Sequence, residues 1–174
     1  MIDPAWPKET ITNRLPVLKP LSEEGIPRQI TWSATRNGPH YRFDFSELGN
    51  EDLAAVRVGK EKPQLRIGRY SQENPFSTSV YFVVVSPTTS LVSMVAEDEN
   101  TESEPIYLTS SVGQLGRASR LFIALHENLA TIGPRQESSP AWKQFADAFR
   151  DLDMDAYQHP FSFWGNMIFE QLQP

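Results

Sequence analysis

The chain has 174 residues, of which 39% are hydrophobic, 11% aromatic and 22% charged, and these proportions exclude a wholly disordered protein. It has no cysteine, which excludes disulfides, thiolate nucleophiles and cysteine-based zinc sites. The net charge of −6 argues against a general nucleic-acid coat, because neutralising phosphates requires an excess of lysine and arginine.

The first 27 residues contain five prolines, which cannot occupy a helix interior or a central strand. They also contain apolar side chains, among them Trp6. We therefore predict an extended arm over residues 1–27, followed by a single domain over residues 28–174. The arm packs either on its own domain or on a partner, and in the second case Trp6 is a predicted partner contact.

Seven segments have the pattern of β-strands: residues 29–33, 40–45, 56–58, 65–67, 78–86, 91–96 and 106–108. In the second of them Tyr41, Phe43 and Phe45 alternate with polar residues, which is typical of a half-buried strand. The segment 78–86 is apolar throughout its middle and rich in valine, so we expect it to be the central strand. The acidic stretch over residues 97–104 is typical of a solvated loop.

After residue 110 the apolar residues recur with the helical period. One stripe runs from Ala118 to Ile132 and ends at Gly133-Pro134, and a second helix begins at Ser139-Pro140. A third, shorter helix follows Pro160, although Gly165 interrupts its pattern. We expect an α+β fold: a mainly antiparallel sheet or partly open barrel of six to seven strands over about residues 28–109, followed by two to three helices over about residues 114–172.

Neither a metal site nor a calcium loop is predicted. The three histidines lack a zinc-protease spacing, because the position four residues after His126 is Ala130. The run Asp151–Asp155 resembles the start of a calcium loop, but Ala156 and Ser162 occupy the positions that need glycine and glutamate. We interpret this run as a solvated acidic helix end.

The strand-to-helix turn over residues 110–120 is a candidate small-anion site. Gly113 and Gly116 leave backbone amides accessible at a helix N-terminus, and Arg117 and Arg120 add positive charge. The turn lacks the lysine of a phosphate-binding loop. We therefore favour a plain flexible connection between strand and helix at this turn.

A basic segment is predicted to bind a partner. Residues 26–72 carry eight basic and five acidic side chains, although the whole chain is acidic. The candidate contacts are Arg57, Lys60, Lys62, Arg66 and Arg69. Arginines interleaved with aromatics also occur in single-strand nucleic-acid binders, but here the aromatics alternate onto the opposite strand face. We therefore favour a protein partner over nucleic acid.

The C-terminal segment is rich in aromatic residues of the kind found in interface hot spots. They are Tyr157, Phe161, Phe163, Trp164 and Phe169. We expect most of this cluster to pack in the core and part of it, Phe163 and Trp164, to contact a partner.

These observations predict a non-catalytic protein–protein interaction module, such as an adaptor, an assembly subunit or an inhibitor. Its partner is another protein or a second copy of the chain, and no cofactor is expected. One alternative is a β-barrel that binds single-stranded nucleic acid. The other is a small enzyme with the anion site at residues 110–120, with His126 and Glu127 as acid and base. No apolar run is long enough to span a membrane, so we expect a soluble, cytoplasmic protein.

Overall fold

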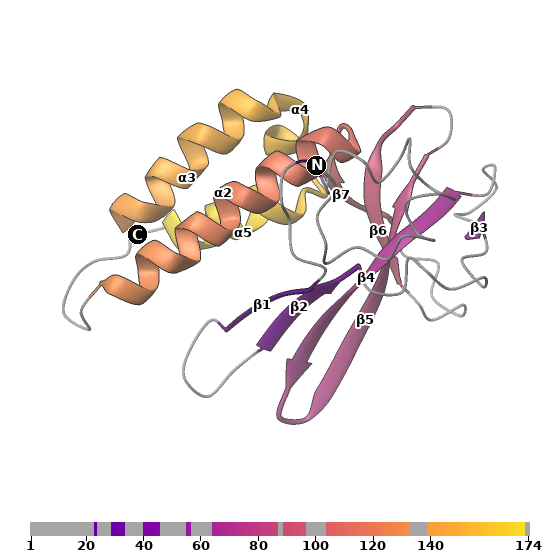
Figure 1. Ribbon diagram of the computed structural model, residues 1–174, viewed down its shortest axis with the longest axis horizontal. Helices are drawn as coiled ribbons and strands as arrows, with labels where there is room; N and C mark the ends of the chain where they lie inside the picture. The colour runs from indigo at the N-terminus through magenta and orange to yellow at the C-terminus, as the bar shows by residue number, and fades with distance from the viewer. Residues whose placement is uncertain are drawn as a thin grey trace.

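The computed structural model describes residues 23, 29–33, 40–45, 55–56, 64–86, 89–96, 104–132 and 139–172. In this part of the chain the strands come first and the helices follow (Figure 1). The strands are β1 (Gln29–Ser33), β2 (His40–Asp44), β3 (Ala55–Val56), β4 (Gln64–Asn74), β5 (Ser77–Val85), β6 (Val92–Ala96) and β7 (Ile106–Thr109). The helices are α2 (Val112–Thr131), α3 (Ser139–Leu152), α4 (Met154–Gln158) and α5 (Phe163–Leu172).

The strands form one antiparallel sheet with the order β1-β2-β4-β5-β6-β7, and β3 pairs with β4. The helices pack against one side of this sheet (Figure 1). The predicted fold class, a mainly antiparallel sheet followed by helices, is confirmed. β5 lies between β4 and β6, so the prediction that residues 78–86 form a central strand is also confirmed.

Strand β4 is much longer than the predicted segment 65–67, because it continues past Gly68 to Asn74. The register with β5 shifts between Arg66 and Gly68, which marks a β-bulge. A Cβ at Gly68 would lie 2.7 Å from Cδ1 of Phe45. Glycine here admits the Phe45 ring against the bulge and does not end the strand.

The core lies between the helices and one face of the sheet. Alternate residues of β1 and β2, such as Trp32 and Phe43, point toward the helices and are buried. The Trp32 ring meets Phe122 of α2 edge-on, with centroids 4.8 Å apart. The Trp164 ring of α5 lies 5.5 Å from that of Phe149 in α3, so one aromatic cluster joins the sheet to three helices.

The third predicted helix corresponds to α5, and an additional helix, α4, precedes it. The short helix α4 was not predicted, and α5 starts at Phe163 rather than at Pro160. No helix within the described residues is both long and apolar enough to cross a membrane. The arm, apart from Glu23, lies outside the described residues, so the division at residues 27 and 28 stays a prediction.

Candidate partner-binding site

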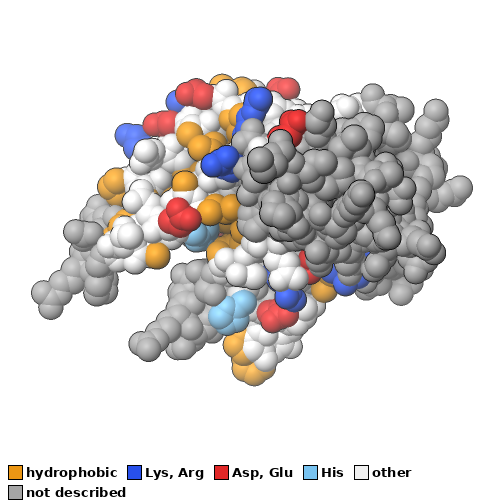
Figure 2. Space-filling view, in the orientation of Figure 1, with side chains coloured by type: hydrophobic (Ala, Val, Ile, Leu, Met, Phe, Trp, Pro, Cys, Tyr) orange, Lys and Arg blue, Asp and Glu red, His pale blue; other side chains and the backbone are white. Residues whose placement is uncertain are grey.

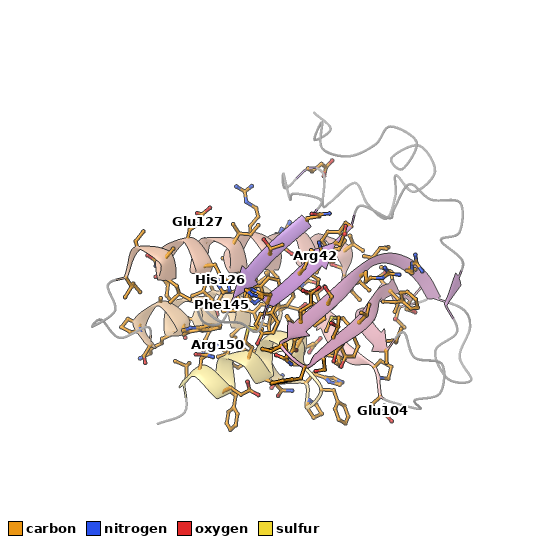
Figure 3. All side chains as sticks on the ribbon, turned by 90° about the horizontal axis from the view of Figure 1, so that it is seen from below. Arg42, Glu104, His126, Glu127, Phe145 and Arg150 are labelled. Atoms are coloured by element: carbon orange, nitrogen blue, oxygen red, sulfur yellow. The ribbon has the colours of Figure 1, made fainter. Side chains whose placement is uncertain are left out.

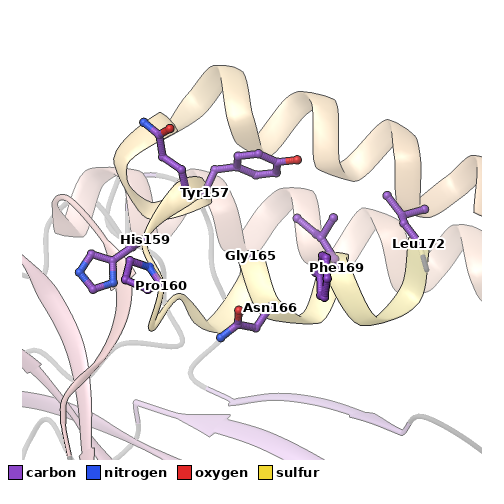
Figure 4. A pocket seen from close by; sticks show the side chains of 9 residues that line it. Tyr157, His159, Pro160, Gly165, Asn166, Phe169 and Leu172 are labelled. Carbon is purple, nitrogen blue, oxygen red and sulfur yellow. The ribbon is translucent and has the colours of Figure 1, made fainter.

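A hollow of about 650 Å³ lies between α4 and α5, near the C-terminal end of the chain (Figure 4). We call it the α4–α5 groove. Its lining residues are Tyr157, Gln158, His159, Pro160, Gly165, Asn166, Ile168, Phe169 and Leu172. Apolar and aromatic side chains with a few polar groups are the usual lining of a binding site.

Gly165 sets the spacing between the two walls of the groove. A Cβ at this position would lie 2.5 Å from the carbonyl oxygen of Tyr157 and 2.7 Å from Oγ of Ser162. The backbone N–H of Gly165 donates a hydrogen bond to the same Ser162 Oγ, at 2.9 Å. The glycine that interrupts the helical pattern is therefore explained by close packing, since a larger residue would push α5 away from the end of α4.

Four large apolar side chains on α4, on α5 and in the connection between them are exposed. Phe169 is 63% exposed and Leu172 is 37% exposed, and both line the groove. Phe161, in the connection between the helices, is 49% exposed, and Met154 on α4 is 47% exposed. The two exposed side chains that line the groove, Phe169 and Leu172, are typical of an interaction site rather than of a solvated helix face.

The start of α4 is fixed by a buried carboxylate. Asp153 is 3% exposed and caps α4 by accepting a hydrogen bond from Ala156 N at 3.2 Å. It also accepts hydrogen bonds from the backbone N and the Oγ of Ser110, each at 2.7 Å. Asp151 and Asp155 are exposed, so the prediction of a solvated acidic run holds for them and is wrong for Asp153. The long-range hydrogen bonds explain the burial.

The same carboxylate lies against the turn that was the candidate small-anion site. Gly113 and Gly116 lie in the first part of α2, and Arg117 and Arg120 are exposed farther along it. The anionic group that accepts hydrogen bonds from Ser110, at the start of this turn, is the Asp153 carboxylate of the chain itself. The turn thus anchors α4, while a small-anion site at these residues stays a candidate.

Strand β7 connects the groove to the sheet. The N–H of Tyr107 donates a hydrogen bond to the carbonyl of Phe161 at 2.8 Å, and the Tyr107 ring lies 4.7 Å from that of His159. Burial and the charges of Asp153 and Asp155 raise the pKa of Tyr107, against the opposing effect of its hydrogen bond with Ser110. These contacts attach the connection between α4 and α5, which contributes to one wall of the groove, to strand β7.

The two aromatic residues predicted to contact a partner lie on the inner side of α5. Trp164 is fully buried and packs against Phe149 and Phe43, so its ring has no surface available to a partner. Phe163 is partly buried and meets the rings of Phe43 and Tyr70 edge-on. Their neighbours Phe161 and Phe169 carry the exposed aromatic surface instead.

The predicted basic surface is described only in part, because Arg57, Lys60, Lys62 and Trp6 lie outside the described residues. Arg66 and Arg69 lie on the sheet face opposite the helices, over the ring of Phe82. The Cζ atom of Arg66 is 4.6 Å from the ring centroid and that of Arg69 is 5.9 Å away. Phe82 therefore makes cation–π contacts within the chain.

His126 and Glu127 do not form an acid–base pair. His126 points toward the interior, whereas Glu127 points away from it (Figure 3). The His126 ring lies 4.5 Å from that of Phe122 and 5.9 Å from that of Trp32, and its buried Nε2 has no hydrogen-bond partner among the described residues. Burial lowers the pKa of His126 to about 4, so the ring is neutral near pH 7. No cluster of three metal-ligating side chains occurs in the described part of the chain.

Sequence reasoning missed one exposed aromatic residue, Phe76, which is 99% exposed. It lies in the turn between β4 and β5, at a hairpin tip that projects away from the helices and carries hydrophobic surface (Figures 1 and 2). The dipeptide Asn74-Pro75 is a turn signal that could have identified the hairpin.

Comparison with protein families matches residues 9–171 to the SUKH-4 immunity protein family, which covers nearly the whole chain. Searches of curated proteins and of solved structures found no match. The chain belongs to the SUKH-4 immunity protein family.

Proposed function

We propose that this chain is an inhibitor that binds a partner toxin directly and neutralises it in the cytoplasm. The observation that carries the proposal is the family match over residues 9–171, because an immunity protein acts on a toxin. The match spans both the sheet and the helices, so it covers the α4–α5 groove and the exposed side chains around it.

The contacts of the ionisable side chains that face the interior support binding rather than catalysis. Asp153 is engaged in capping α4 and anchoring Ser110, and His126 faces an aromatic interior. The exposed features are instead aromatic and aliphatic side chains, which are the residue types that supply binding energy at protein interfaces.

Nucleic-acid binding, the alternative function, has less support. A single-strand binder presents aromatic faces beside its arginines, so that bases stack while phosphates pair. Here Tyr41, Phe43 and Tyr70 lie on the helix-covered face of the sheet, opposite Arg66 and Arg69. Phe82, on the arginine side, already contacts both guanidinium groups.

Co-expression tests the proposal. Each toxin domain encoded in the genome of origin is expressed in a bacterial host, with and without this chain, and growth is followed. We expect this chain to restore growth for one toxin and to form a stable complex with it in analytical ultracentrifugation. Restored growth without a complex, or no restoration for any of these toxins, would overturn the proposal.

A further inference from the structure

The α4–α5 groove has the size and the apolar lining of a binding site. Its volume of about 650 Å³ lies within the usual range of ligand sites and accommodates several side chains. Ile168, which is 3% exposed, forms an apolar base, and Phe169 and Leu172 follow one another along α5 (Figure 4). Covering such side chains on binding removes apolar area from water and stabilises the complex.

The groove is preformed in the isolated chain. Gly165 lies directly against the end of α4, and the hydrogen bond between Tyr107 N and the Phe161 carbonyl ties the intervening connection to β7. Asp153 fixes the first turn of α4 to Ser110. Because the walls are held by contacts within the chain, little ordering cost is added when a partner binds.

The helices that form the groove carry charges of one sign, although neither acidic side chain lines the groove itself and the charge of Glu170 also acts on Tyr41 of β2. From Met154 to Leu172 the chain has two acidic side chains, Asp155 on α4 and Glu170 on α5, and it has no lysine or arginine. Both acidic side chains are exposed, and neither forms an ion pair within the described residues. On the neighbouring α3, Arg150 already pairs with a carboxylate of its own helix, at 3.3 Å.

We infer that the α4–α5 groove receives the partner toxin, and that it binds a segment whose apolar side chains are flanked by lysine or arginine. This inference rests on the proposed function. The apolar residues of the segment contact Phe169 and Leu172, and its basic residues face Asp155 and Glu170. Complementary charge of this kind selects the partner and speeds association, whereas the apolar contacts hold the complex together.

Two synthetic helical peptides test the chemistry of the groove. Both carry one face of leucine, and the rest of the peptide is lysine in the first and glutamate in the second. Binding to the full chain is measured by fluorescence anisotropy at physiological salt, and the contact is mapped by amide chemical shifts. We expect the lysine peptide to bind and to shift the amides of Gly165, Asn166 and Phe169, and the glutamate peptide not to bind.

Matched variants locate the contact. Phe169→Ala should weaken lysine-peptide binding about tenfold or more, whereas Phe76→Ala, which removes an even more exposed aromatic ring at the hairpin tip, should leave it unchanged. Glu170→Lys should weaken binding, and Glu127→Lys on α2 should have a much smaller effect. Equal binding of both peptides, or equal losses in Phe169→Ala and Phe76→Ala, would overturn the inference.

The toxin that the wild-type chain neutralises distinguishes failure of the inference from failure of the proposed function. If Phe169→Ala, Leu172→Ala and the double variant neutralise that toxin as well as wild type does, the groove is not its docking site while the function stands. If no toxin is neutralised, the proposed function itself fails. A wild-type dimer that Phe169→Ala converts to a monomer would also overturn the inference, because a second copy would then occupy the groove.

Discussion

Substitution of Asp153 tests whether one buried carboxylate holds the helical layer to the sheet. The side chain accepts three hydrogen bonds, two from Ser110 at 2.7 Å and one from Ala156 N at 3.2 Å. Asp153→Ala removes the acceptor and leaves three donors without it, and it also removes the N-cap of α4. Each hydrogen bond to a charged group contributes about 1.5–3 kcal/mol to stability.

The expected loss is smaller than the sum of these contributions. The donors of Ser110 are only partly buried, so water replaces some of the lost bonds, and the variant no longer buries a charge. We expect Asp153→Ala to lower the free energy of unfolding by about 3–5 kcal/mol. Asp153→Asn keeps the shape and one oxygen acceptor but places an NH₂ group beside a donor, and we expect a loss of about 1–3 kcal/mol.

Guanidinium unfolding followed by tryptophan fluorescence measures these losses, because Trp32, Trp142 and Trp164 are buried in the folded state. The control is Asp151→Ala, which removes an exposed carboxylate two residues away and should change stability by less than about 0.5 kcal/mol. An Asp153→Ala protein within about 1 kcal/mol of wild type would refute the assignment of Asp153 as the anchor of α4.

Three further predictions concern tight packing and pH. Gly165→Ala should destabilise the chain by about 1–3 kcal/mol, since the new Cβ would lie 2.5 Å from the carbonyl oxygen of Tyr157; a melting temperature at or above that of wild type would contradict this. Gly68→Ala should cost a similar amount in chemical denaturation, because its Cβ would lie 2.7 Å from the Phe45 ring; an unchanged midpoint would show that the ring moves freely. Burial lowers the pKa of His126 to about 4, so the unfolded chain takes up this proton at higher pH than the folded chain does. Stability should therefore fall as the pH drops from about 6.5 toward 4, by roughly 1–2 kcal/mol after allowance for the partial exposure of the ring. His126→Phe should flatten that part of the pH profile measured by urea unfolding, and an unchanged slope would contradict the placement of the ring.

The order and type of most elements could be predicted from the sequence because they follow local rules. The alternation of Tyr41, Phe43 and Phe45 identified β2, and the valine-rich segment identified β5 as an inner strand. The helical stripe that begins near Ala118 identified α2. The prediction of a protein-interaction role is confirmed in general terms by the family.

Tertiary structure decided which residues of these elements reach the surface. Trp164 and Phe169 are both aromatic residues of α5, yet the first is fully buried and the second is 63% exposed. A helical pattern predicts which residues lie on the same side of α5. The packing of α3, the sheet and α4 against α5 determines which of its sides is buried. Asp153 illustrates the same point, since its partner Ser110 lies 43 residues away in the sequence. Local periodicity follows from the backbone of each element alone, whereas burial depends on distant segments that meet only in the folded chain.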